Sequence, residues 1–269
     1  MFILFLSLVI SIQNGYSINP IKEYKMTPEQ FNIAFEEMKV KTSDGAELNV
    51  WIMKSSIEEK RNYTFVIAGS DAGNMGFSIP FAFHLLNNGY DVVTFDYRGF
   101  GGSSDFNFNP NNLYHDEYIN DFTTVINWTR NKLKPENIGV LAFSMGTLIS
   151  TVGYRNAKYE ILVGEGFLKC PTNVAKRIEK IKGKKIIIPK SRKSICKRTK
   201  EIEIPLLLFA SKNDKITILK DSQEVGEQKQ NRELIPFDGD HLKGAFTLGL
   251  NNYIIEINKM IEKTSANKG

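Results

Sequence analysis

Cysteine, histidine and tryptophan are scarce in this sequence: its 269 residues include two Cys, three His and two Trp. The cysteines and histidines show no CxxC or HxxxH spacing, so the sequence contains no recognisable metal-binding motif. It also lacks a self-similar period, a low-complexity tract and a heptad run, which excludes repeat and fibrous architectures. We therefore expect neither a metal nor a cofactor, and any chemistry must come from ordinary side chains.

The sequence also lacks an apolar run of the ~20 residues that a transmembrane helix needs. A shorter apolar run covers residues 2–12, followed by Gly15 and Ser17 at the spacing that a signal peptidase accepts. We therefore expect residues 1–17 to be a signal peptide, residues 18–269 to be the mature domain, and the protein to be exported to the periplasm or secreted. No Lys or Arg precedes the run, so a buried first helix or an uncleaved anchor is the alternative.

Acidic residues are nearly missing from one segment. Residues 169–200 contain 13 Lys and Arg but only one acid, Glu179, whereas the whole chain has a net charge of only +5. Cys170 and Cys196 both lie in this basic segment. In an oxidising compartment they could form a disulfide, which would stabilise the fold by ~3 kcal/mol in the chain-entropy model. Two reduced thiols are the alternative.

Apolar strands alternate with amphipathic helices along most of the remaining chain. YTFVIAG (63–69) and IGVLAFS (138–144) are nearly unbroken apolar runs, which suit strands covered on both faces. Segments such as IPFAFHLLNNGY (79–90) have apolar residues at helical spacing. The alternation predicts an α/β fold with a mostly parallel sheet flanked by helices. Two earlier strands joined at Asp44-Gly45 predict an antiparallel N-terminal hairpin.

Ser144 follows the second of these apolar strands directly. Its small neighbours Ala142 and Gly146 suit a sharp turn from strand to helix, where the two backbones come close and the serine hydroxyl rises above the sheet. The N-terminus of the following helix would stabilise an oxyanion, with the Met145 N–H as the donor. The pattern indicates a serine nucleophile.

A nucleophilic serine needs a histidine base. His241 lies in a loop between the last predicted strand and the last helix, and it is the candidate base. His84 falls within the apolar spacing of a helix, which indicates a packing or surface role. His115 follows an Asn-rich loop and is expected to be solvated.

The base in turn needs a carboxylate that orients it. Asp214 follows a buried strand, and loops at the carboxyl ends of strands gather around sites in such sheets. Asp238 and Asp240 are alternatives, although each could simply make local turn bonds beside Gly239. Asp214 is the predicted acid.

Four motifs in order resemble the α/β-hydrolase family over nearly all of the mature chain. AFSMG resembles the G-x-S-x-G elbow, FDYRGFGGSS (95–104) resembles the D-x-R-G-x-G-x-S segment after the fourth strand, and SKND and GDH follow. The chain looks most like the serine aminopeptidase and monoacylglycerol-lipase-like subgroup. It departs from the family at Ala142, and at AGSDAGN (68–74), where relatives often carry His-Gly.

The resemblance implies an α/β-hydrolase fold with Ser144, His241 and Asp214 as a catalytic triad. It also implies that the Asp71 N–H is the second oxyanion donor, with Ser70 or Ala72 close by, unless the Asp71 carboxylate interferes by facing the site. The basic segment would form a small cap, at about residues 168–203 after the sixth strand, over the mouth of the pocket.

The predicted function is a serine hydrolase that cleaves a carboxylic ester or related acyl bond of a small molecule. A peptidase on the same scaffold and a non-catalytic protein that binds anionic surfaces are the alternatives. The basic cap could attract anionic lipid, lipopolysaccharide or an acidic polymer, or it could simply be a solvated lid. Nucleic acid is not an expected partner, because no aromatic interleaving or binding module accompanies the lysines.

Overall fold

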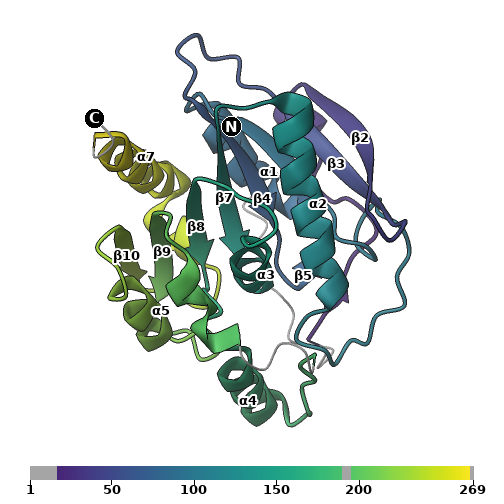
Figure 1. Ribbon diagram of the computed structural model, residues 1–269, viewed down its shortest axis with the longest axis vertical. Helices are drawn as coiled ribbons and strands as arrows, with labels where there is room; N and C mark the ends of the chain where they lie inside the picture. The colour runs from purple at the N-terminus through teal and green to yellow at the C-terminus, as the bar shows by residue number, and fades with distance from the viewer. Residues whose placement is uncertain (1–16, 190–194, 267–269) are drawn as a thin grey trace.

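The computed structural model of the protein describes residues 17–189 and 195–266 (Figure 1). The predicted signal peptide, residues 1–17, lies outside the described residues except for Ser17. Within the described ranges, none of the helices has the length and hydropathy of a membrane span.

An eight-stranded sheet forms the centre of the molecule. Neighbouring strands are parallel along one side of the sheet and across its middle, and the two strands at the N-terminal edge form an antiparallel hairpin. The predicted mostly parallel sheet is therefore confirmed. The spatial order is β10 (Arg232–Phe237), β9 (Leu206–Ser211), β8 (Ile161–Glu165), β7 (Asn137–Phe143), β4 (Tyr63–Ala68), β6 (Asp91–Phe95), β3 (Glu47–Met53) and β2 (Phe35–Lys41).

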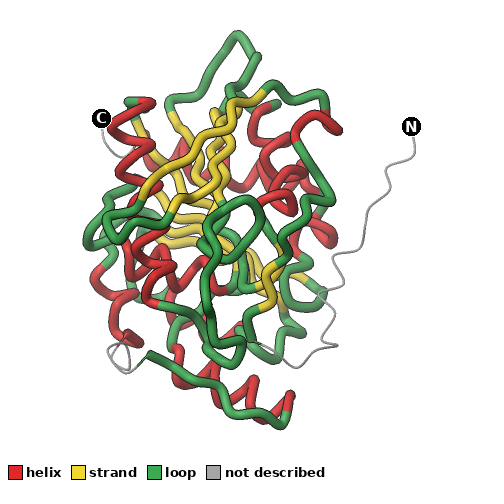
Figure 2. The backbone as a smooth tube through the Cα atoms, turned by 90° about the vertical axis from the view of Figure 1, so that its right-hand side faces the viewer, coloured by secondary structure: helices red, strands yellow, loops and turns green. Residues whose placement is uncertain are grey.

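Helices cover both faces of this sheet (Figures 1 and 2). Side chains of α2 (Asp116–Leu133), α3 (Met145–Gly153) and α5 (Leu219–Gly226) pack in one apolar cluster, and those of α1 (Ile79–Leu86) and α7 (Leu250–Ala266) in another. The short helix α6 (Gly244–Leu248) leads into α7.

Strand β7 shows why its sequence is apolar throughout. Successive side chains of a strand point to opposite faces, so Val140 and Ala142 enter the first cluster while Leu141 and Phe143 enter the second. All four are at least nine-tenths buried. A polar residue at any of them would lose its hydration without a guaranteed partner.

The strands that follow β4 in the chain are added first on one side of β4 and then on the other. The chain passes from β4 outward to β6, and then returns across β4 to β7. In open α/β sheets, ligands bind at the carboxyl ends of the strands beside such a switch point. The residue that follows β7 at this position is Ser144.

A two-stranded ladder lies apart from the main sheet. It pairs β1 (Asn19–Pro20) in parallel with β5 (Ala72–Gly73), so the beginning of the described chain lies against the loop that follows β4. Two short 3-10 helices, η2 (Pro28–Phe31) and η3 (Met75–Ser78), follow these two strands.

The predicted cap segment lies between β8 and β9. It contains α4 (Pro171–Lys182) and the 3-10 helix η5 (Ile195–Glu201), and residues 190–194 lie outside the described residues. α4 lies at the foot of the molecule in both views. The division into a signal peptide and one mature domain stays a prediction.

Candidate active site

Ser144 occupies a tight turn between β7 and α3. Its backbone has φ 47° and ψ −112°, a left-handed conformation that is strained for a residue with a Cβ. Two hydrogen bonds stabilise the turn: the Thr147 N–H and hydroxyl donate to the Ser144 carbonyl at 2.9 and 2.7 Å. Strain maintained by its surroundings is common at functional sites.

The helix can start this close to the sheet only because its second residue is glycine. A Cβ at Gly146 would lie 2.3 Å from the Ala68 carbonyl oxygen and 2.6 Å from that of Gly69. Ala142, which stands where the family motif has its first glycine, is fully buried and paired with Ala68 and Gly164 on the neighbouring strands. A small side chain fits there, so the turn keeps its shape.

The structure brings Ser144, His241 and Asp214 together. The Ser144 Oγ lies 3.0 Å from the His241 Nε2, and the His241 Nδ1 lies 2.5 Å from the Asp214 Oδ2. The Ser144 residue is 5% exposed, the Asp214 side chain 2% and the His241 side chain 20%. The imidazole is therefore the member of the trio with the most contact with solvent.

Asp214 is fixed by its own loop. Its Oδ1 accepts hydrogen bonds from the Ile216 and Thr217 N–H groups, at 2.7 and 3.0 Å, and its Oδ2 accepts from the Thr217 hydroxyl. The same hydroxyl lies 3.2 Å from the His241 Nδ1. Both carboxylate oxygens thus accept hydrogen bonds from the loop, and the Oδ2 also points at the imidazole. Sequence reasoning missed Thr217, although a hydroxyl residue three positions after an acid at a strand end is a visible signal.

The charges of the site shift the pKa values of the acid and the base in opposite directions. Burial by itself would lower the pKa of His241, but the hydrogen bond and charge of Asp214, helped by Asp71 and Glu165, outweigh it and raise this pKa. Burial would likewise raise the pKa of Asp214, yet the hydrogen bond and charge of His241 and the bonds from Thr217 and Ile216 lower it to about 2. Asp214 is therefore ionised at neutral pH.

A second buried carboxyl, Glu165, lies behind the histidine loop at the end of β8. It is 1% exposed and accepts a hydrogen bond from the Gly244 N–H at 2.6 Å, and burial raises its pKa to about 7. A Cβ on the next residue, Gly166, would lie 2.9 Å from the His241 Cε1. This glutamate was not predicted, although an acid that ends an apolar strand beside the nucleophile strand could have drawn attention to it.

The Met145 N–H is the first of α3, a position with no partner inside the helix. The other predicted donor residue, Asp71, has a carboxyl that interacts with His241, with Lys182 of the cap and with its own backbone N–H, and burial raises its pKa. The carboxyl is therefore close enough to His241 and Lys182 to interact electrostatically with both. The Asp71 N–H has a competing acceptor in its own side chain.

The remaining candidates lie elsewhere. His84 belongs to α1 and contacts Phe83. His115 precedes α2 and packs against the rings of Phe106 and Tyr118, with 12% of its side chain exposed. The expectation that His115 is solvated was wrong, because its aromatic neighbours cover the ring.

The alternative acids make other contacts. The Asp238 side chain is 77% exposed and pairs with Lys212, and the Asp240 carbonyl accepts a turn bond from the Lys243 N–H. Among the residues that the structure describes, no group of three or more His, Cys, Asp or Glu could hold a metal ion.

Comparisons with known proteins support the fold. A sequence model of the family described as "alpha/beta hydrolase fold" matches residues 65–161. The esterase Pf2001 of Pyrococcus furiosus has a TM-score of 0.75 to this chain at 20% identity, covering 91% of this chain and 97% of the esterase. A serine hydrolase without a lid from Xanthomonas campestris has a TM-score of 0.62 at 15% identity, over 85% of this chain and 94% of that one.

The chain has the α/β-hydrolase fold. The predicted resemblance to this superfamily is thereby confirmed. At these identities, the structural likeness shows the fold alone. Among curated proteins, YfhR of Escherichia coli, itself uncharacterized, is 25% identical over 77% of this chain and 73% of its own length. Protein bem46 of Schizosaccharomyces pombe is 31% identical over 86 residues, so this chain spans only 28% of that relative.

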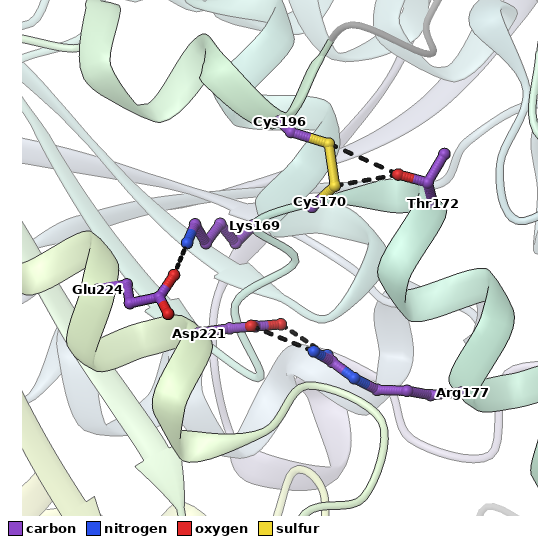
Figure 3. The surroundings of a disulfide bond; sticks show 7 residues. All are labelled: Lys169, Cys170, Thr172, Arg177, Cys196, Asp221 and Glu224. Carbon is purple, nitrogen blue, oxygen red and sulfur yellow. Dashed lines mark hydrogen bonds and ion pairs between the residues drawn. A yellow bond between two sulfur atoms is a disulfide. The ribbon is translucent and has the colours of Figure 1, made fainter.

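Figure 3 shows a disulfide within the predicted cap segment and two ion pairs from this segment to α5. A disulfide joins Cys170, at the start of α4, to Cys196 in η5, which decides between the two thiol states that the sequence left open. Lys169 pairs with Glu224 of α5, and Arg177 pairs with Asp221 of the same helix at 2.6 Å.

Arg177 also connects the cap to the acid loop of the site. Its guanidinium donates to the Ile216 carbonyl at 2.9 Å, two residues after Asp214. Lys182, at the other end of α4, interacts with Asp71. α4 therefore lies beside the candidate site and contacts two of the loops that form it.

Proposed function

We propose that the protein is a serine hydrolase that cleaves a carboxylic ester or a related acyl bond of a small molecule. The observation that carries the proposal is the continuous chain of short contacts from the Ser144 Oγ through His241 to Asp214. A serine, a base within hydrogen-bond reach and an acid that orients the base form the arrangement that activates a hydroxyl nucleophile.

In the proposed reaction, the His241 Nε2 takes the Ser144 hydroxyl proton while the Oγ forms a bond to the substrate carbonyl carbon. Asp214 accepts from the Nδ1–H, which holds the imidazole in the tautomer with a free Nε2 and stabilises the imidazolium. The Met145 N–H and a backbone N–H of the loop around Asp71 stabilise the oxyanion. The imidazolium then protonates the leaving oxygen, and a water molecule releases the acyl group by the same steps in reverse.

We expect the hydrolysis rate to rise with pH with a midpoint above 6.5. His241 must be neutral to accept the proton, and its pKa is raised above the usual value of 6.5, so the protonated, inactive form persists to higher pH. Asp214, with a pKa of about 2, stays ionised throughout. A profile of kcat/KM for a short p-nitrophenyl ester between about pH 5 and pH 9 measures this limb. A midpoint below 6.5 would contradict the assignment of His241 as base.

A peptidase is the second candidate, and one feature favours it. The Asp71 carboxyl interacts electrostatically with His241, and a carboxylate near the base would suit a substrate with a free ammonium group. Side-by-side rates on p-nitrophenyl esters and aminoacyl p-nitroanilides separate the two functions. Faster turnover of the anilides, lost in Asp71→Asn, would favour the peptidase. The subgroup resemblance is compatible with either and stays a prediction.

We further propose that the cap binds an anionic lipid surface. Between residues 171 and 189, four lysines are exposed together with two exposed isoleucines, Ile181 at 47% and Ile187 at 41%. A cationic side chain near an anionic membrane contributes ~1 kcal/mol, and exposed apolar side chains add favourable burial. The lysines are Lys176, Lys180, Lys184 and Lys185.

The charge reversal Lys184→Glu/Lys185→Glu tests this proposal. We expect it to weaken binding to vesicles that contain anionic lipid by about tenfold or more, and to leave hydrolysis of small neutral esters unchanged. The matched control is Lys54→Glu/Lys132→Glu, which makes the same charge change at exposed positions near the amino ends of the parallel strands. Equal losses in both double variants, or a parallel fall of ester hydrolysis, would contradict the proposal.

Export is part of the proposal and is supported by the disulfide, because disulfides persist in oxidising compartments. Fractionation of cells that produce the full chain, with thiol labelling of Cys170 and Cys196, measures the location and the redox state together. Reduced protein in the cytosol would contradict export.

A further inference from the structure

The segment Ile18–Ile21, which we call the strap, forms a backbone ladder with the loop that follows β4. The Asn19 N–H donates to the Asp71 carbonyl at 2.8 Å, and the Ile21 N–H donates to the Gly73 carbonyl at 2.8 Å. In the parallel register, Asn19 lies opposite Ala72 and Pro20 opposite Gly73. We call residues Gly69–Gly73 the oxyanion loop, because the predicted second oxyanion donor belongs to it.

The strap is itself held firmly in place. The Ile18 N–H donates to the Pro110 carbonyl at 3.2 Å. Ile18 is 1% exposed and belongs to the main apolar cluster. Burying an isoleucine side chain fully is worth about 1.5–3 kcal/mol. The strap is therefore an anchored part of the fold and not a loose terminal segment.

The far end of the strap is fastened from two more directions. The Asn74 side-chain amide donates to the Ile21 and Glu23 carbonyls at 3.0 and 2.7 Å, and the Gly101 N–H donates to the Ile21 carbonyl at 3.0 Å. Asn74 directly follows the oxyanion loop. The loop is thus bonded to the strap at the Asp71 and Gly73 carbonyls and just beyond its end.

The opposite side of the oxyanion loop faces the nucleophile turn. The carbonyl of Gly69, the first residue of the loop, and that of Ala68 at the end of β4 lie so close to Gly146 that no side chain fits between them. One side of the loop therefore abuts the elbow, and its other side is bonded to the strap.

We propose that the strap is a positioning element of the active site, which holds the oxyanion loop at the distance from the nucleophile that oxyanion binding requires. The inference rests on the proposed function. Asn19 and Ile21 act through the loop and touch no reacting atom. A backbone donor must lie within a few tenths of an ångström of its place to bind the oxyanion, and small displacements in an active site cost up to ~100-fold in rate.

Asn19→Pro tests the proposal, because proline has no N–H and removes the bond to the Asp71 carbonyl. Asn19→Ala is the matched control: it changes the side chain but keeps the N–H. We expect Asn19→Pro to lower kcat by about 10–100-fold with KM within about twofold, and to weaken binding of a boronate transition-state analogue by a similar factor. Asn19→Ala should match the parent.

Active-site titration with a fluorophosphonate separates positioning from simple loss of folded protein. If the strap only stabilised the fold, Asn19→Pro would contain fewer reactive sites, each with the parent's kcat, and the proposal would be overturned. Reactive sites at full count but with reduced kcat support it. A parent protein that hydrolyses no acyl substrate would overturn the proposed function and this inference together, whereas an active parent with an equally active Asn19→Pro overturns the inference alone.

A second variant serves if Asn19→Pro does not fold. Asn74→Asp keeps an oxygen that can accept from the Gly76 N–H, as the Asn74 Oδ1 does at 3.1 Å, but replaces the amide that donates to the strap. The same loss of kcat at nearly constant KM is expected. Unchanged kcat in folded Asn74→Asp protein would count against the proposal.

Discussion

Ser144→Ala is expected to lower the kcat of ester hydrolysis by about 10⁶-fold, the size of effect seen when a triad nucleophile is removed. The Oγ is the atom that forms the proposed acyl-enzyme, and it lies 3.0 Å from the His241 Nε2. Removing it creates no cavity of consequence in the core, so the unfolding temperature should stay within about 2 °C of the parent's, a change of well under 1 kcal/mol. The measurements are p-nitrophenyl ester turnover and a thermal melt.

Ser150→Ala is the matched control for this variant. Ser150 lies in the same helix, is fully buried, and its hydroxyl donates only to the Thr147 carbonyl. It should retain the parent's activity and its labelling by a fluorophosphonate, whereas Ser144→Ala should not be labelled. Equal hydrolysis by the parent and Ser144→Ala would refute the assignment. A parent that resists labelling but binds anionic vesicles in a salt-sensitive way would instead indicate the non-catalytic surface-binding protein.

Asp214→Asn is expected to lower kcat by about 10⁴-fold. The Oδ1 accepts from two backbone N–H groups, so an asparagine would keep its oxygen there and turn its amide toward His241. That amide donates to the Nδ1 and forces the imidazole proton onto the Nε2, which can then no longer accept the serine proton. The fold should tolerate the change, because the shape is conserved. Turnover and a melting curve check both statements.

The control for Asp214→Asn is Asp238→Asn, at one of the alternative acids. Its side chain is largely exposed and pairs only with Lys212, and an exposed ion pair is worth little. We expect near-parental activity. Loss of activity in Asp238→Asn with retention in Asp214→Asn would reverse the assignment of the acid.

Some features of the site were visible in the sequence because they are local. A strand that is covered on both faces is apolar at every position, as β7 is. A turn that brings a helix against a strand needs small residues, as at Gly146. These two local patterns identify the turn at Ser144 from the sequence alone. The order of serine, acid and histidine along the chain follows from the strand order of the sheet. The disulfide, by contrast, depends on the separation of two residues that are 26 positions apart.

The sequence by itself determined the α/β architecture, the nucleophile turn and the basic character of the segment between β8 and β9, because each depends on residue type and spacing within one short stretch. Only the tertiary structure decided which histidine meets the serine, that Glu165 lies behind it, that Asp71 interacts with His241 and that the strap bonds to the oxyanion loop. These facts depend on where distant segments converge, and side-chain contacts between segments far apart in the chain follow from the packing of the whole domain.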